Sequence, residues 1–280
     1  MSNIAVLGTG LLGSGFAENL LGKGHTVRVW NRTSAKTAAL RSKGALVAAD
    51  PAEAVRGASH VHLVLAEDDA VDAVIAALRP GLARGVPIVD HSTNLPARVA
   101  ARVPELRAQG VTYIPAPVFM SPQNARDASG MMVISCPKAD ADALFAHLAA
   151  MTGTLVHAGE RPDLAAVWKL AGNSLFFAIA AAMSDVFAIG KGSQVDTATM
   201  LKLFEAFKPF SSLQYIAQRV AHAAENAASF EVSMARKDAR LMLETAGDVP
   251  TLVLPAVAAA MDKAIARGDG RRDYTAFTLA

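Results

Sequence analysis

The sequence predicts an α/β protein with an N-terminal doubly wound, mostly parallel sheet, a long interdomain helix and an all-α C-terminal domain. Two observations carry this prediction. Short apolar runs alternate with helical patterns up to about residue 158, which is typical of parallel strands joined by crossover helices. Beyond that point the apolar spacing is helical throughout. We therefore expect a first domain over residues 1–160 and a second over residues 161–280.

Composition argues against several classes of protein. The chain has 280 residues and a net charge of +2, with its basic residues scattered, which argues against nucleic acid as the main partner. Its one cysteine, Cys136, cannot support a disulfide framework. The chain enters a strand pattern directly, and no apolar run reaches the roughly 18 uninterrupted residues that cross a bilayer. We expect a cytoplasmic protein with no signal peptide and no membrane partner.

The first elements contain a glycine-rich turn. They are a strand at Asn3–Leu7, the turn Gly8-Thr9-Gly10-Leu11-Leu12-Gly13, a helix from Leu11 to Leu21 and a strand at Thr26–Trp30. This order is the context that the G-x-G-x-x-G fingerprint of a dinucleotide-binding Rossmann domain requires. Gly8 permits the tight turn, Gly10 lets the backbone approach a pyrophosphate, and Gly13 lets helix and strand pack closely. We predict cofactor contacts at these glycines and at Leu11 and Leu12.

The end of the second strand indicates which cofactor binds. NAD-binding domains usually place an acidic residue there, whereas this chain has Asn31-Arg32-Thr33. Asn31 removes a carboxylate that would repel a 2′-phosphate, Arg32 can pair with that phosphate, and the Thr33 hydroxyl can hydrogen-bond it. NADP(H) is therefore predicted over NAD(H). The alternative is a solvated Arg32, with Thr33 or Ser34 only capping the next helix.

Strands and helices continue to alternate through the rest of the first half. Expected strands are Leu46–Ala48, His60–Leu65, Pro87–Asp90, Thr112–Ala116, Met131–Ser135 and Thr154–His157, and expected helices are Pro51–Arg56, Asp69–Leu78, Leu95–Gln109 and Lys138–Met151. Ligands of such sheets gather beyond the carboxyl ends of the strands. Leu65, Ala66 and Thr93 follow two of these ends and are predicted to contact the cofactor. His91, taken alone, is more consistent with a structural role.

A long helix is predicted from Pro162 to about residue 190, with glycines at its end. Apolar residues cover all its faces, so we expect it to be buried all round. It nevertheless carries Lys169 and Asn173, which lie four residues apart and therefore on one face. A buried lysine must be paired, deprotonated or put to use. The alternative is a lysine that extends to solvent at the edge of the helix.

Helical patterns fill the C-terminal half. They run over Thr197–Phe207, Ser212–Glu225, Glu231–Ala246 and Leu252–Arg267. The third contains Lys237-Asp238, which is otherwise an ordinary exposed charged turn. This half and the long helix carry more apolar surface than one protomer can cover, so we expect a homodimer or homotetramer built on the C-terminal domain.

Several motifs, in order, resemble those of the β-hydroxyacid dehydrogenase family, which includes 3-hydroxyisobutyrate dehydrogenases and glyoxylate/succinic semialdehyde reductases and is related to 6-phosphogluconate dehydrogenases. The matching segments are the glycine turn, Asp90-x-Ser92-Thr93-x-x-Pro96, Ala116-Pro117-Val118, Lys169-x-x-x-Asn173 and Lys237-Asp238. The resemblance implies that Lys169 is the general acid/base and that Asn173 orients the substrate. It also implies that Thr93 and Lys237 lie near the nicotinamide. Burial would lower the pKa of Lys169, and a nearby Lys237 would lower it further.

The same resemblance implies hydride transfer between a nicotinamide cofactor, predicted above as NADP(H), and a short hydroxy acid, oxo acid or semialdehyde, and we expect no metal. One segment departs from the family. Where the family has Ser-Gly-Gly after Pro-Val118, this chain has Phe119-Met120-Ser121, so the carboxylate-binding hydroxyl and the small glycines are replaced. Substrate contacts are predicted at Val118, these three residues and Asn173.

Two alternatives stay open. An imine reductase, from a related branch, would suit the apolar Phe119 and Met120 although that branch usually lacks the lysine. A catalytically inactive cofactor-binding module is the other, and the presence of Lys169, Asn173 and Lys237 counts against it.

Overall fold

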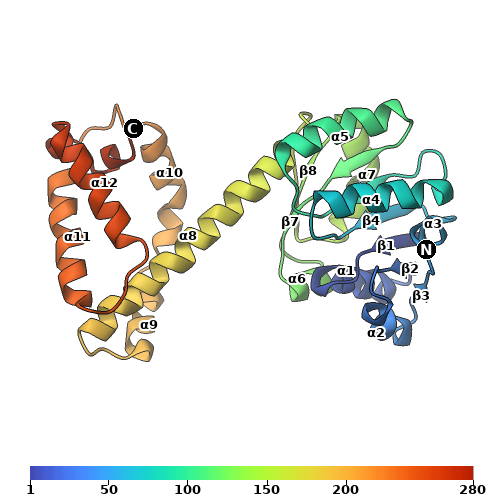
Figure 1. The fold of residues 1–280 in the computed structure, drawn as a ribbon, viewed down its shortest axis with the longest axis horizontal. Coiled ribbons are helices and arrows are strands. Elements are labelled where there is room, and N and C mark those ends of the chain that lie inside the picture. Colours follow the sequence, from blue (N-terminus) through green and yellow to red (C-terminus); the bar gives the residue numbers. More distant parts are fainter. Residues whose placement is uncertain (280) are drawn as a thin grey trace. The chain divides into compact units, whose positions relative to one another are not determined.

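The structure is a computed structural model that describes residues 1–279. The chain divides into two compact units, residues 1–173 and 174–280, so the boundary falls inside the long helix (Figure 1). The first unit holds two hydrophobic core clusters and the second holds one.

A six-stranded parallel sheet forms the centre of the first unit. Its strands are β1 (Asn3–Leu7), β2 (Thr26–Trp30), β3 (Leu46–Val47), β4 (His60–Leu63), β5 (Ile88–Asp90) and β6 (Tyr113–Pro115). They are ordered β3-β2-β1-β4-β5-β6, so the strand order reverses between β1 and β4. In a doubly wound sheet this reversal is where a ligand binds, beyond the carboxyl ends of the strands. The predicted fold class is confirmed.

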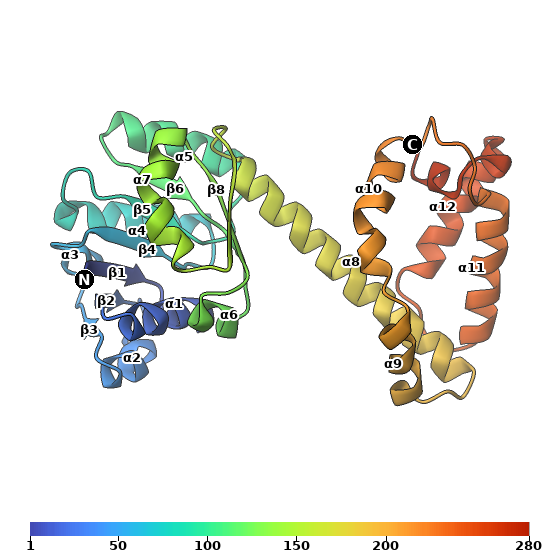
Figure 2. The ribbon, with the colours of Figure 1, turned by 180° about the vertical axis from the view of Figure 1, so that it is seen from behind.

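Helices cover both faces of this sheet. One face carries α1 (Leu11–Gly22), α2 (Ala38–Ser42), α6 (Pro122–Asp127) and α7 (Lys138–Ala149), and the other carries α3 (Pro51–Val55), α4 (Asp68–Leu78) and α5 (Pro96–Ala108). The helices α4 and α5 lie in front of the sheet in Figure 1, and α7 lies in front of it in Figure 2. Each face buries its own apolar cluster, which explains why the strands are apolar on both sides.

The sequence predicted one sheet, but the first unit also has a three-stranded sheet made of β7 (Val118–Phe119), β8 (Met131–Ser135) and β9 (Thr154–Gly159). β7 runs antiparallel to β8, whereas β8 and β9 are parallel. The strand β7 was missed because it has two residues and lies between Pro117 and Pro122, as is typical of an edge strand. This edge strand presents the predicted substrate segment.

The helix α6, directly after that segment, was also not predicted. Ser121 caps it: the Ser121 hydroxyl accepts from the Asn124 backbone N–H at 3.1 Å, and the Asn124 side chain accepts from the Ser121 N–H at 2.9 Å. This reciprocal pair satisfies two backbone donors at the start of a polar helix. Ser121 therefore has a structural role in addition to the predicted substrate contact.

The long helix α8 (Leu164–Gly192) begins two residues later than predicted and is not buried all round. Phe176 is 62% exposed and Phe177 is 73% exposed. The prediction was wrong because apolar residues show only that a helix face favours burial. They do not show that other residues of the same chain bury it. By length and composition α8 could cross a membrane, contrary to the expectation from its polar residues, and it is the only such helix among residues 1–279. A core helix of a soluble protein passes the same test.

The second unit is all-α in its described residues, as predicted. It contains α9 (Thr197–Ala206), α10 (Leu213–Ala221), α11 (Val232–Ala246) and α12 (Leu254–Ala266), together with the end of α8. The buried Asp185 carboxylate of α8 accepts hydrogen bonds from the backbone N–H groups of Leu252, Val253 and Leu254. These bonds lower the pKa of Asp185 against the effect of burial. Asp185 thereby fixes α12 on α8.

Candidate active site

The glycine turn after β1 is tightly packed against neighbouring backbone at Gly8 and Gly13, whereas Gly10 has open space beside it. Gly8 has φ +99°, and a Cβ there would lie 2.2 Å from the Val64 carbonyl oxygen. A Cβ on Gly13 would lie 1.9 Å from the Gly8 oxygen, so α1 approaches the turn closely. By contrast, a Cβ on Gly10 would meet no atom within 4 Å. The turn thus leaves space beside Gly10, at the start of α1, which fits a dinucleotide pyrophosphate.

Side chains after β2 hold this turn in shape. Asn31 accepts from the Thr9 backbone N–H at 3.0 Å and donates to the Thr33 carbonyl at 3.0 Å. Arg32 is exposed, and within residues 1–279 its guanidinium makes no hydrogen bond or ion pair. Asn31 is therefore committed to the turn, while the Arg32 guanidinium is exposed and makes no bond within residues 1–279.

The loops after β4 and β5 are joined at the same edge of the sheet. The Leu65 backbone N–H donates to the Ser92 hydroxyl at 2.9 Å. The fully buried Asp90 carboxylate accepts from the Ser92 N–H at 2.9 Å and from the Asn94 amide at 2.7 Å. Ala66 and Thr93 are exposed on these loops. The predicted cofactor contacts after β4 and β5 thus come together beside the glycine turn.

A buried network behind these loops was not predicted. The Tyr113 hydroxyl donates to Asp90 at 2.5 Å, and Arg102 donates to Asp68 at 2.7 Å and to Tyr113 at 3.3 Å. Burial, followed by the neighbouring Asp90 carboxylate, raises the pKa of Tyr113 well above its usual value. The only sequence signal was an arginine on the apolar face of α5. This network fixes the Asp90 carboxylate, which in turn bonds the loop after β5.

Lys169 contacts the predicted substrate segment, and Asn173 lies beside Lys169. The Lys169 ammonium is half-buried on α8 and donates to the Val118 carbonyl at 2.8 Å and to the Asn173 side-chain oxygen at 3.0 Å. Its nitrogen also lies 4.6 Å from the centre of the Phe119 ring. Burial lowers the pKa of Lys169. Lys169 is thus held as a hydrogen-bond donor at the edge of β7.

Phe119 packs on the backbone of α8, a contact that was not predicted. A Cβ on Gly172 would lie 2.4 Å from the ring of Phe119, so only glycine admits the ring at this position. Met120 covers a second glycine, since a Cβ on Gly130 would lie 2.9 Å from the Met120 Cγ. Phe119, which replaces the serine of the family, and Met120, which replaces its first glycine, are thus accommodated by glycines elsewhere in the chain.

Lys237 belongs to the second unit, where it lies on α11. Its exposed ammonium pairs with the adjacent Asp238 carboxylate at 2.5 Å. Its predicted place near the nicotinamide stays a prediction.

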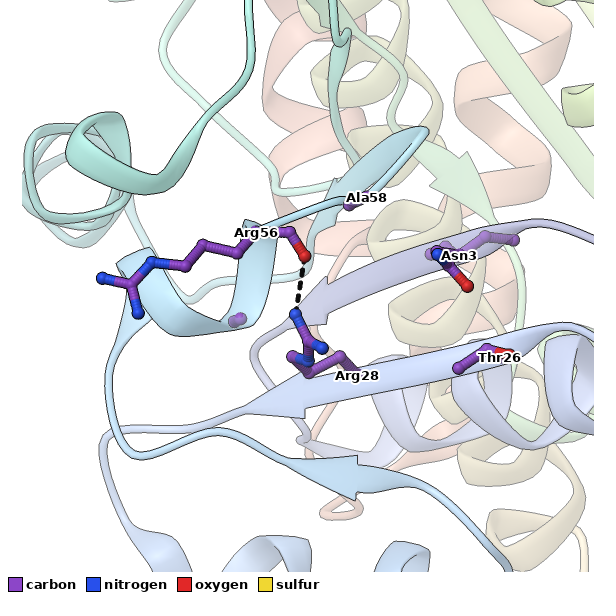
Figure 3. A pocket seen from close by; sticks show the side chains of 7 residues that line it. Asn3, Thr26, Arg28, Arg56 and Ala58 are labelled. Atoms are coloured by element: carbon purple, nitrogen blue, oxygen red, sulfur yellow. Dashed lines mark hydrogen bonds between the residues drawn. The ribbon is translucent and has the colours of Figure 1, made fainter.

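A small cavity lies at the opposite edge of the sheet. It has a volume of about 60 Å³ and is lined by the first residues of β1 and β2, Asn3 and Thr26, and by Arg28 and Arg56 (Figure 3). The Arg28 guanidinium donates to the Arg56 carbonyl at 2.7 Å, which commits it to the protein. This cavity is at the amino ends of the strands and is not part of the candidate site.

Comparison with known proteins assigns the first unit. Residues 3–159 match the family model of the NAD-binding domain of 6-phosphogluconate dehydrogenase. The 3-sulfolactaldehyde reductase of Escherichia coli K12 is 25% identical over 99% of this chain and 94% of its own length. An uncharacterised oxidoreductase of Bacillus subtilis, YfjR, is 28% identical over 98% of this chain and 97% of its own.

Solved structures share the whole fold. The imine reductase of Myxococcus stipitatus in complex with NADP⁺ has a TM-score of 0.88, 20% identity and coverage of 99% of both chains. A V8 variant of that enzyme in complex with NAD⁺ has a TM-score of 0.86 and 19% identity, and covers 99% of this chain and 98% of its own. At this identity the likeness concerns the fold.

Proposed function

Because the chain belongs to the 6-phosphogluconate dehydrogenase and β-hydroxyacid dehydrogenase family, we propose that it transfers a hydride between NADP(H) and a short oxo acid or semialdehyde. The chain is an NAD(P)-dependent oxidoreductase by this membership. The reduced substrate would be the corresponding hydroxy compound. The observation that carries the proposal is the Lys169 ammonium, held at 2.8 Å by the carbonyl of Val118 beside the substrate segment.

The cofactor would be held by the glycine turn and the two loops beside it. Gly8, Gly10 and Gly13 form the cradle for the pyrophosphate, with the N–H groups of Leu11 and Leu12 at the start of α1. The Leu65, Ala66 and Thr93 loops stand beside it. When bound, the nicotinamide supplies or accepts the hydride.

NADP(H) is the cofactor that Arg32 favours. Its exposed guanidinium is the group that can pair with a 2′-phosphate, whereas no carboxylate follows β2 to hold a ribose hydroxyl. Thr33 is exposed beside it and would add a hydroxyl to the same phosphate.

Lys169 would donate the proton that the reaction requires. As a hydride reaches the carbonyl carbon, the C=O double bond becomes a C–O single bond and its oxygen takes a proton. Lys169 gives that proton and becomes a neutral amine, which solvent then reprotonates. Burial of the lysine eases this step because it lowers the cost of losing the proton. Asn173, bonded to Lys169 at 3.0 Å, would fix the direction of the ammonium and contact the substrate.

A second candidate is reduction of an imine. The observation that favours it is Phe119, whose ring occupies the place of the family's carboxylate-binding serine and lies 4.6 Å from Lys169. An apolar ring offers no hydrogen bond to a carboxylate and suits an uncharged substrate. The same lysine would then protonate the nitrogen.

An NADPH-oxidation screen over short oxo acids, semialdehydes and cyclic imines separates these candidates. Oxo acids or semialdehydes as the best substrates would support the first candidate, and cyclic imines as the best would replace it by the second. NADPH binding without turnover of any class would indicate a cofactor-binding module and would remove both.

We also propose that the chain is a soluble, cytoplasmic homodimer or larger oligomer in which a second copy covers α8. Exposed apolar side chains gather on α8 and on the helices that follow it, including Phe176, Phe177, Leu201, Phe207 and Leu213. Covering such a surface with a second copy removes apolar area from water. Lys169, Asn173 and Asp185 argue against a bilayer as the cover, since each would be costly in lipid.

A further inference from the structure

Three histidines form a hydrogen-bonded chain through the first unit. His147 on α7 meets His62 on β4, with 2.9 Å between their Nε2 atoms. The other nitrogen of His62, Nδ1, lies 2.9 Å from Nε2 of His91, directly after β5. His91 in turn places its Nδ1 2.8 Å from the Ala116 carbonyl oxygen. The rings of His62 and His91 are nearly coplanar, with 5° between their planes and 5.2 Å between their centroids, as a hydrogen bond between ring edges requires.

The positions of the hydrogens along this chain follow from its last partner. A carbonyl oxygen only accepts, so the Nδ1 atom of His91 must carry a hydrogen. The Nε2 atom of a neutral His91 then accepts from the Nδ1–H of His62, and the Nε2 atom of His62 accepts from the Nε2–H of His147. Burial lowers the pKa of all three rings, which keeps them neutral. Every bond therefore donates inward, toward Ala116.

The chain ends at the backbone that holds Lys169. Ala116 begins the short segment 116–118. The Val118 carbonyl at the other end of this segment accepts a hydrogen bond from the Lys169 ammonium at 2.8 Å. The segment is also held by bonds from the Ala116 N–H to the Asp90 carbonyl at 2.7 Å and from the Val133 N–H to the Pro117 carbonyl at 3.0 Å, and by the antiparallel pairing of Val118 with Met132. A backbone carbonyl cannot pass a proton on. The three histidines therefore hold segment 116–118 in position and do not conduct protons to Lys169.

Other groups face the chain from the elements packed against it. The His60 ring stacks on His147 with centroids 3.9 Å apart, and the Phe16 ring of α1 lies 4.8 Å from His91. Lys23 and His25, after α1, oppose a positive charge on His147, whereas the Asp90 carboxylate favours one on His91. These rings do not converge on one point, and among residues 1–279 no group of three such side chains is placed to bind a metal ion.

We propose that His91 is a positioning residue for Lys169, acting through the Ala116 carbonyl on segment 116–118, and that His62 and His147 hold His91 in the tautomer this requires. This proposal rests on the proposed function only in assuming that Lys169 takes part in catalysis. The position of the lysine can be measured without turnover, and so the two can fail separately.

The test compares His91→Leu, which keeps bulk but no donor, with His91→Asn, whose amide can donate where Nδ1 stands. A matched control is His157→Leu, because His157 also bonds a backbone carbonyl, that of Cys136, at 2.8 Å, but lies on β9, which pairs with β8 and not with segment 116–118. Competitive acetylation of the full chain by acetic anhydride, read by mass spectrometry against pH, gives the labelling midpoint of Lys169 in each variant.

We expect His91→Leu to move this midpoint upward by about half a pH unit or more, because a released segment lets water reach the lysine. His91→Asn and His157→Leu should leave it near the wild-type value. An unchanged midpoint in His91→Leu would overturn the proposal, as would an equal shift in His157→Leu.

If His91→Leu does not fold, the tautomers of the three histidines in the wild-type chain still test the proposal. Nitrogen-15 NMR of histidine-labelled protein should show His91 and His62 protonated on Nδ1 and His147 on Nε2. The opposite tautomer of His91 would overturn the proposal. Normal turnover of Lys169→Ala would remove the catalytic role of the lysine and leave both of these measurements interpretable.

Discussion

The Lys169 ammonium lies 4.6 Å from the centre of the Phe119 ring, and that ring packs on Gly172, three residues further along the same helix. The residue that replaces the family's serine is thus fitted against the lysine that would carry the reaction. A cation near an aromatic face is attracted to it by about 0.5–2 kcal/mol. Phe119 is therefore placed to decide which substrates share the site with Lys169.

Phe119→Ser should shift the substrate preference toward small carboxylates, because it replaces an apolar ring by a hydroxyl. We expect the ratio of kcat/KM for short oxo acids to that for uncharged substrates to rise about tenfold. The single change leaves Ser121 in place to cap α6, which a full Ser-Gly-Gly replacement of residues 119–121 would not. Phe119→Leu, which keeps an apolar side chain, is the control. An unchanged ratio would show that other residues select the substrate.

Arg32→Ala should weaken NADPH binding by about tenfold or more and leave NADH nearly unchanged, since only NADPH carries the 2′-phosphate. Dissociation constants from the quenching of tryptophan fluorescence measure both. Arg41→Ala, an exposed arginine on α2, controls for the general loss of a positive charge. Equal losses for both cofactors would refute the assignment of NADP(H).

The first unit should lose stability as the pH falls below about 6.5, the usual pKa of histidine in an unfolded chain. Burial, followed by the neighbouring His60, lowers the pKa of His147 to about 3, and burial lowers that of His62 well below its usual value. The folded state thus resists protons that the unfolded state takes up. The stabilisation is complete above pH 6.5 and is lost as the pH falls toward the folded-state values, by at most about 1.4 kcal/mol per pH unit for each histidine.

Urea midpoints at pH 7.5 and pH 5 test this dependence. Both tryptophans, Trp30 and Trp168, lie in the first unit, so their fluorescence follows its unfolding. His147→Gln should make the dependence shallower, whereas His157→Gln, at an exposed position, should not. Equal midpoints for the wild-type chain at the two pH values would contradict the expectation.

Phe177→Glu should dissociate the proposed oligomer, because it puts a charge on the exposed apolar face of α8. Light scattering at micromolar concentration should give at least a dimer for the wild-type chain and a smaller species for the variant. Phe145→Glu, at a 58% exposed position on α7, is the matched control. A monomeric wild-type chain would rule out the oligomer as the cover of α8.

Much of the fold could be predicted because its signals are local. The glycine turn fixed the first β-α-β unit, and alternating apolar runs gave the strands of the main sheet. The two-residue β7 and the short polar helix α6 carry little local signal, and β7 forms only by pairing with β8. The exposure of Phe176 and Phe177 could not be predicted either, since composition does not say which chain covers a helix.

The candidate site was predictable where motif residues mark it in the sequence. Lys169, Asn173 and Val118, each predicted as a site residue, lie together in the structure, and their roles stay predictions. What the sequence could not show is the support behind them. Gly172 looks like any helix glycine, and Tyr113 and His91 look like strand and loop residues. Their roles depend on partners that are far away along the chain.

The most direct test of the central claim is the turnover number of Lys169→Ala, measured beside its affinity for NADPH. If Lys169 supplies the proton, kcat should fall by about 100-fold or more while the dissociation constant of NADPH stays near the wild-type value. Lys169→Arg should not restore turnover, because a guanidinium does not give up a proton near neutral pH. Lys191→Ala, at an exposed lysine on the same helix, should behave as wild type. A Lys169→Ala variant with near-normal kcat would contradict the account.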